Sequence, residues 1–204
     1  MKEWNQDRFL DCWSKERPKL LGFEQEREAS VAVPLLVTEE GPGILFEVRS
    51  SDLQTQPGEI CFPGGGIEGK ESPAEAALRE TKEELLISGD KIHLLTQIDG
   101  TLGPSGAPMW AFLVQLEDYQ GTYSKDEVAE VFVLSLEELL AAEPVMHSIA
   151  MKPIPDEGFT DMIGQEYRWQ GRRQSMPFYL FGRHLIWGAT GRILKNFLDR
   201  VRAM

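Results

Sequence analysis

The chain has 204 residues and carries 21 Lys and Arg against 33 Asp and Glu, a formal net charge of −12 at pH 7. This balance argues against nucleic acid as a partner, because such surfaces need clustered basic residues to attract phosphates. Hydrophobic residues make up 42% of the chain, as in ordinary globular proteins, and no linker-like run divides it. We therefore expect a single domain over residues 1–204.

The cysteines and the apolar runs bear on location. Cys12 and Cys61 are too few for a disulfide framework, and Cys61 is expected to be packed rather than catalytic. No charged-then-apolar leader opens the chain, and no apolar run approaches the length that crosses a bilayer. These features predict a cytoplasmic protein with reduced thiols and no membrane partner.

The N-terminal half begins with a predicted helix and a predicted hairpin. Apolar side chains recur at roughly helical intervals between residues 4 and 13, which predicts a helical extension over about residues 1–20. The runs Ser30–Val37 and Ile44–Arg49 are strand-like and are separated by a Gly/Pro turn. Pro34 requires an edge or bulge position, because proline has no N–H for a central ladder.

A second helix has a clear start. Ser72 is a suitable N-cap, Pro73 occupies the first helical position, and Glu75 completes a capping box. An apolar stripe then follows at helical spacing. Its members are Ala74, Ala77, Leu78, Thr81 and Leu85.

This spacing places Glu80, Glu83 and Glu84 on another side of the helix, away from the core. Like charges at these separations repel, and a divalent cation would relieve the repulsion. Carboxylate oxygens suit Mg²⁺ or Mn²⁺, which also bind substrate phosphates. A solvated acidic helix face is the alternative reading of this cluster.

The spacing of a longer segment, from Gly65 to Ile87, favours the metal site. The matching positions are Gly65, Glu71, Arg79, Glu80, Glu83, Glu84 and Ile87. Together they resemble the Nudix box of the Nudix hydrolases. Thr81 and Leu86 depart from it, since the family usually has an aliphatic residue and a glycine there.

The resemblance implies roles for these residues. Glu80 and Glu84 would hold the divalent cation, with Glu83 and the carbonyl group of Gly65 nearby. Glu83 is either a ligand or the general base. Arg79 would pair with Glu71 or with a catalytic carboxylate and hold the loop in place.

An upstream segment, Leu45–Gly65, resembles the signature of the coenzyme A pyrophosphatase branch of this family. The residues that this likeness assigns to substrate binding are Arg49, Ser50, Gln54, Gly58 and Phe62. Gln54 stands where the signature has an arginine, and it offers only a neutral amide in place of a charged fork.

The rest of the chain alternates short strands with helices. Strands are expected at Glu59–Phe62, Lys91–Ile98, Met109–Leu116, Val128–Leu134 and Pro177–Phe181. A short helix starts at Ser135, and a terminal helix follows His184–Gly191, where the sequence again resembles coenzyme A-type Nudix enzymes. Residues Pro144–Gln174 show no clear pattern. Glu127 and Glu130 are candidates for an assisting acid, although solvated surface positions are favoured for both.

The resulting expectation is an α/β fold, a Nudix-type α/β/α sandwich with a mixed β-sheet. The implied activity is metal-dependent hydrolysis of the diphosphate linkage of coenzyme A or its acyl derivatives. Another nucleoside diphosphate substrate, such as ADP-ribose, is the alternative enzyme reading, and a non-catalytic nucleotide-binding domain is a further one. The expected partner is a small molecule, and a homodimer is kept open as the assembly.

Overall fold

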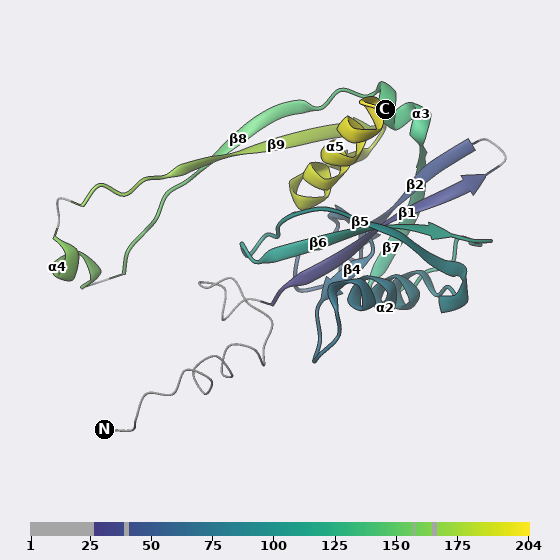
Figure 1. Ribbon diagram of the computed structural model, residues 1–204, viewed down its shortest axis with the longest axis horizontal. Coiled ribbons are helices and arrows are strands. Elements are labelled where there is room, and N and C mark those ends of the chain that lie inside the picture. Colours follow the sequence, from purple (N-terminus) through teal and green to yellow (C-terminus); the bar gives the residue numbers. More distant parts are fainter. Residues whose placement is uncertain (1–26, 39–40, 157, 165–166) are drawn as a thin grey trace, which may run out of the picture.

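The computed structural model describes residues 27–38, 41–156, 158–164 and 167–204. The helical extension expected over about residues 1–20 lies outside these residues. A mixed seven-stranded sheet forms the centre, with one long helix on each face (Figure 1). Each helix covers its own cluster of buried apolar side chains. The expected α/β sandwich with a mixed sheet is confirmed.

The central sheet contains β1 (Ala29–Thr38), β2 (Gly41–Arg49), β3 (Ile60–Cys61), β4 (Gly64–Gly66), β5 (Ile92–Leu102), β6 (Pro108–Leu116) and β7 (Val128–Ser135). The helices are α2 (Pro73–Leu85), α3 (Leu136–Ala141), α4 (Phe159–Ile163), α5 (Gly188–Arg202) and the 3₁₀ turn η1 (Gly89–Lys91). A second sheet contains β8 (Val145–Met151), β9 (Arg172–Phe181) and β10 (His184–Ile186).

Strands β1 and β2 form the expected hairpin, but β1 is not an edge strand. It pairs in parallel with β6 on one side, and on its other side with β4 near its start and β2 near its end. The expectation that Pro34 needs an edge or bulge is therefore wrong. The Ala32 N–H donates to Pro63 O at 2.8 Å on the β4–β2 side, so the Pro34 nitrogen faces the gap between those two partners.

This gap results from a divergence of β1 and β2, and residues 60–66 fill it. Strand β3 pairs with the end of β2, and β4 pairs with the start of β1. A Cβ on Gly64 would lie 2.3 Å from the Ser30 carbonyl oxygen, so glycine is required for this close approach. The glycine loop is thereby fixed against the centre of the sheet.

Helix α2 starts and ends as local sequence chemistry dictates. The Ser72 hydroxyl accepts from Glu75 N–H, and the Glu75 carboxylate accepts from Ser72 N–H, which confirms the capping box. Leu86 caps the C-terminus in the left-handed conformation, with φ of 51°. A glycine would adopt this conformation without strain, which explains the residue usual at this position of the box.

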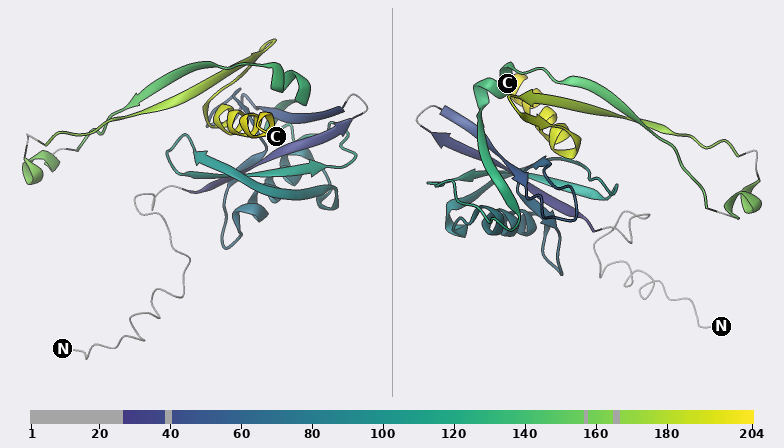
Figure 2. Two further views of the ribbon diagram at one scale, coloured as in Figure 1. Left: turned by 45° about the horizontal axis from the view of Figure 1, so that its top comes forward. Right: turned by 180° about the vertical axis from the view of Figure 1, so that it is seen from behind.

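The segment Pro144–Gln174, for which the sequence shows no pattern, contains one side of a long arm. Strands β8 and β9 pair as a hairpin that extends away from the central sheet, with α4 near its far end (Figures 1 and 2). The loop between β5 and β6 spans residues 103–107, shorter than the interval between the expected strands Lys91–Ile98 and Met109–Leu116, because both strands extend further. None of the helices in the described segments is long and apolar enough to cross a membrane.

Candidate active site

Arg79 is the centre of a network that ties α2 to the preceding loop. Its guanidinium donates to both carboxylate oxygens of Glu71, at 2.8 and 3.1 Å, and to the Gly66 carbonyl at 3.1 Å. It also donates to Glu80 at 2.8 Å and to Glu83 at 3.2 Å. Hydrogen bonds from Arg79 hold the pKa of Glu71 below its usual value. One cation thus separates carboxylates that would otherwise repel one another.

Glu84 lies in the core, which differs from the expected position on the face away from it. The residue is 3% exposed, and its carboxylate accepts from the Gly64 N–H at 2.8 Å. Burial raises its pKa to about 8, and the charge of Glu80 contributes, while the Gly64 N–H acts in the opposite direction. The helical repeat alone misses this because segments distant in sequence contact the last turn of α2: Gly64 binds the Glu84 carboxylate, and Ser124 N–H donates to the Glu84 carbonyl.

Glu47 is a buried carboxylate that the sequence reasoning missed. It lies on β2, is 1% exposed, and its Oε1 atom has no hydrogen-bond partner. Burial and then the charge of Glu84 raise its pKa well above the usual value. The available signal was a lone glutamate inside the apolar run Ile44–Val48. A charged group in a buried strand needs partners, and among the described side chains the carboxylate accepts only from the Cys61 thiol, whose sulfur lies 4.0 Å from Oε2.

The remaining acidic residues surround this buried pair. Glu80 is half-buried and has its pKa raised by burial, against the effect of Arg79. A Cβ on Gly65 would lie 2.4 Å from Glu80 Oε1, so the carboxylate reaches the loop backbone because Gly65 has no side chain. Glu127 is exposed, and its charge raises the pKa of Glu84. Glu130 is instead paired with Arg183 at 2.6 Å.

The donor chemistry of this site fits a hard divalent cation. After burial, the charge of Glu127 contributes to the raised pKa values of Glu47, Glu80 and Glu84, and the backbone of Gly65 lies beside Glu80. All are oxygen donors, as Mg²⁺ and Mn²⁺ prefer. Among the described residues, no group of three or more His, Cys, Asp or Glu side chains is already gathered tightly enough to hold an ion.

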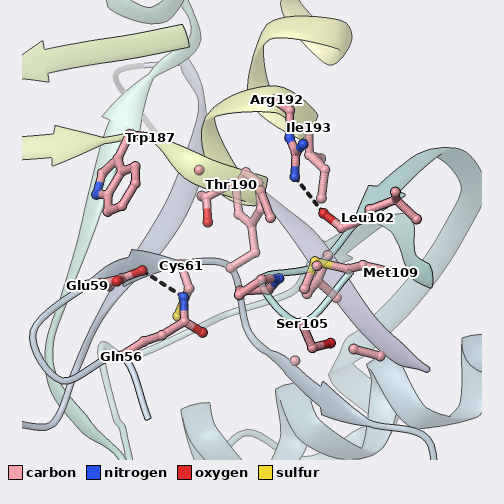
Figure 3. A pocket seen from close by; sticks show the side chains of 18 of the residues that line it. Gln56, Glu59, Cys61, Leu102, Ser105, Met109, Trp187, Thr190, Arg192 and Ile193 are labelled. Atoms are coloured by element: carbon pink, nitrogen blue, oxygen red, sulfur yellow. Dashed lines mark hydrogen bonds between the residues drawn. The ribbon is translucent and has the colours of Figure 1, made fainter. Parts of the chain in front are cut away.

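A cavity of about 590 Å³ adjoins the glycine loop. Its wall comes from β3 and β4, the loop 103–107, the base of the arm and the start of α5 (Figure 3). The lining is mostly apolar. It includes Phe62, Met109, Met151, Met176 and Trp187. Its size is in the range of about 300–1,000 Å³ that small-molecule sites occupy.

Only some of the residues that the sequence assigned to substrate binding line the cavity. Arg49 and Phe62 line the cavity, and Phe62 also stacks on Phe46 with ring centroids 5.0 Å apart. The other three lie outside the lining. Ser50 is buried, and its hydroxyl accepts a hydrogen bond from Asp52 N–H. Gly58 closes a turn, in which its N–H donates to the Arg49 carbonyl. Gln54 is exposed.

Cys61 and Gln56 also contact the cavity. Burial and the neighbouring Glu47 charge raise the pKa of the Cys61 thiol far above its usual value, so it stays protonated and is a poor nucleophile. This agrees with the expectation of a packed thiol. The Gln56 amide donates to Glu59 at 2.7 Å on the same side of the cavity (Figure 3), a contact that the sequence did not indicate.

The fold and this site define a class of α/β enzyme in which a glycine loop and a glutamate-bearing helix act on phosphate groups. The NUDIX domain family model matches residues 26–155. The chain therefore belongs to the Nudix family, and it is a hydrolase that acts on phosphoanhydride bonds.

Relatives and solved structures agree with this assignment. The Nudix hydrolase NudL of Enterobacter sp. (strain 638) is 34% identical over 139 residues, covering 66% of this chain and 71% of that protein. The human mitochondrial coenzyme A diphosphatase NUDT8 is 30% identical over 177 residues, covering 84% of this chain and 68% of its own length. A MutT/nudix protein of Enterococcus faecalis is similar in fold, with a TM-score of 0.54 at 19% identity, over 99% of this chain and 71% of that one.

Proposed function

We propose that this Nudix pyrophosphatase cleaves the diphosphate linkage of coenzyme A or of its acyl derivatives. The observation that carries the proposal is the cavity beside the glycine loop, because its wall joins Arg49 and Phe62 to an apolar surface of methionine and tryptophan side chains. Such a wall suits a substrate with a long, weakly polar arm attached to a diphosphate. Similarity to the human mitochondrial coenzyme A diphosphatase supports the same substrate.

The reaction is attack of water on a phosphorus atom of the diphosphate. Glu80, Glu84 and the Gly65 carbonyl would hold Mg²⁺ or Mn²⁺, which when bound neutralises phosphate oxygens and lowers the pKa of coordinated water. Arg79 positions the Glu80 carboxylate and anchors the loop through Glu71. Glu83 is 56% exposed and accepts from Arg79 at 3.2 Å, and it would serve as a further ligand or as the general base.

Gln54 bears on the choice between coenzyme A and ADP-ribose. Its side chain is exposed and lies outside the cavity lining. The difference between Gln54 and the arginine of the coenzyme A signature therefore does not change the cavity wall. For this reason we favour the coenzyme A compounds over ADP-ribose as substrates.

The test is product formation by the purified protein with Mg²⁺ or Mn²⁺ on coenzyme A, acetyl-coenzyme A and ADP-ribose side by side. We expect the coenzyme A compounds to be cleaved with the higher kcat/KM. Glu84→Gln should abolish turnover, whereas Glu137→Gln on α3, an exposed glutamate outside the cavity lining, should leave it unchanged. Preference for ADP-ribose would overturn the substrate proposal, and undiminished turnover of Glu84→Gln would overturn the site.

A further inference from the structure

Two arginines of the cavity wall have no acidic partner among the residues that the structure describes. Arg192 comes from α5 and Arg172 from the start of β9, and both line the cavity. No ion pair with a carboxylate is formed by either of them within the described part of the chain. Other arginines do find carboxylates. These are Arg79, Arg183, Arg200 and Arg202.

The lack of an acidic partner is unusual for Arg192 because its side chain is partly buried. One terminal nitrogen donates to the Leu102 carbonyl, as Figure 3 shows, but its Nε atom is buried without a partner. Burial lowers its pKa, and the like charge of Arg172 lowers it further. A bound anion would stabilise a partly buried cation that lies beside a second cation. No described residue that lines this end of the cavity supplies a carboxylate.

The charge of the cavity wall also favours an anion as its ligand. Among the described residues that line it, three are arginines and one, Glu59, carries a carboxylate, although the protein as a whole carries a net charge of −12. Glu59 is bonded to Gln56, and Figure 3 places that pair across the cavity from Arg192. The Arg172–Arg192 end is therefore locally positive. Residues Gly188–Thr190, which start α5 without a side-chain cap, line the same cavity.

We propose that Arg172 and Arg192 form a binding subsite for a phosphate monoester that the substrate carries in addition to its diphosphate. Two guanidinium groups offer paired N–H donors that match the oxygens of a dianionic phosphate. Coenzyme A carries such a group on its ribose, and ADP-ribose carries none. The identity of the substrate rests on the function proposed above, but anion binding by the two arginines does not.

The first test measures binding without metal, by titration calorimetry with adenosine 3′,5′-bisphosphate and adenosine 5′-monophosphate. We expect the bisphosphate to bind the unaltered protein at least about tenfold more tightly, since charge-assisted hydrogen bonds are the strong ones. Arg192→Gln and Arg172→Gln should each remove most of this preference. Arg173→Gln is the matched control, because Arg173 is adjacent in β9 but bonds to Ser148 instead of lining the cavity.

Equal affinity of the unaltered protein for the two nucleotides would overturn the subsite. So would a preference that persists in both cavity variants. Inorganic phosphate serves as a further probe. If it binds as tightly as the bisphosphate and loses affinity in the same variants, the arginines take free phosphate and the substrate-borne group is excluded.

The second test measures hydrolysis of coenzyme A and of the same compound lacking its ribose phosphate. The two cavity variants should raise KM about tenfold for coenzyme A alone, with kcat unchanged, because the lost contact is remote from the cleaved bond. Equal KM increases for both compounds would contradict the subsite. If neither compound is cleaved, the proposed function fails, while the calorimetric result still decides whether the arginines bind a phosphate monoester.

Discussion

The carboxyl group of Glu84 is held where ionisation is unfavourable in the metal-free protein. Burial raises its pKa from 4.5 to about 8, so the folded state binds a proton that the unfolded state has released. The stability from this group is present below pH 4.5 and is lost as the pH rises towards 8. We expect the free energy of unfolding in EDTA to fall by on the order of 1–3 kcal/mol between pH 5 and pH 8.

Urea titrations at several pH values check this expectation. Glu84→Gln should show a flatter profile, because the substitution removes the group and also the charge that raises the pKa of Glu47. Mg²⁺ should stabilise the unaltered protein more at pH 8 than at pH 5, since only the ionised carboxylate binds the cation. An equally steep profile in the variant would show that other groups control the pH dependence.

Leu86 is a second residue whose effect on the free energy of unfolding can be measured. It adopts a left-handed backbone conformation at the end of α2, while its side chain is 60% exposed and contributes little to the core. Leu86→Gly should therefore raise the free energy of unfolding by about 0.5–1 kcal/mol. Leu86→Ala is the control, because alanine keeps the strained conformation. A gain in the alanine variant as large as in the glycine variant would refute this explanation.

At the scale of elements, the sequence predicts what is local. The capping box of α2 and the apolar stripe depend on neighbours within a few residues, and the structure contains both. The burial of Glu84 could not be predicted in this way, because its partner, the Gly64 N–H, is distant in sequence. Gly64 reaches Glu84 from a loop that lies in the gap between β1 and β2. Glu47 is visible in the sequence as a lone glutamate in an apolar run, but only the fold shows that it lies close enough to Glu84 to feel its charge.

Arg79 joins two elements, the loop that precedes α2 and the helix itself. Arg79→Lys keeps the charge but loses the planar fork that binds Glu71 through two hydrogen bonds. We expect unfolding free energy to fall by about 1–2 kcal/mol and kcat/KM to fall at least about tenfold, as Glu80 loses its fixed position. Thermal melts and kinetics measure these two effects. Lys82→Arg on the exposed side of α2 should change neither.

At the scale of the whole molecule, the cavity and the arm were not predictable from the sequence. The cavity wall combines segments between residues 29 and 193 that meet only after folding. The arm lacks the alternation of buried and exposed residues that marks a strand, because β8 is exposed along its whole length. Sequence patterns report burial, and a strand that buries neither face gives no such pattern.

The arm also bears on assembly. An isolated two-stranded hairpin is only marginally stable in water, and exposed apolar patches mark interaction sites. Strand β8 is an edge strand, and the far part of the arm presents Ile154, Phe159 and Met162, with Ile154 92% and Met162 90% exposed. A second copy of the chain is the partner that we propose, because two-fold homodimers are the commonest soluble assemblies.

Light scattering coupled to gel filtration should accordingly give the mass of a homodimer at micromolar concentration. The double substitution Ile154→Asp and Met162→Asp should convert it to a monomer that retains the fold, since both side chains are exposed within the protomer. Val37→Asp, which alters an exposed apolar residue on the central sheet, should leave the dimer intact. A monomeric mass for the unaltered protein would contradict the dimer. A dimer that survives the double substitution would place the contact elsewhere, since two buried charges at an apolar interface would be strongly destabilising.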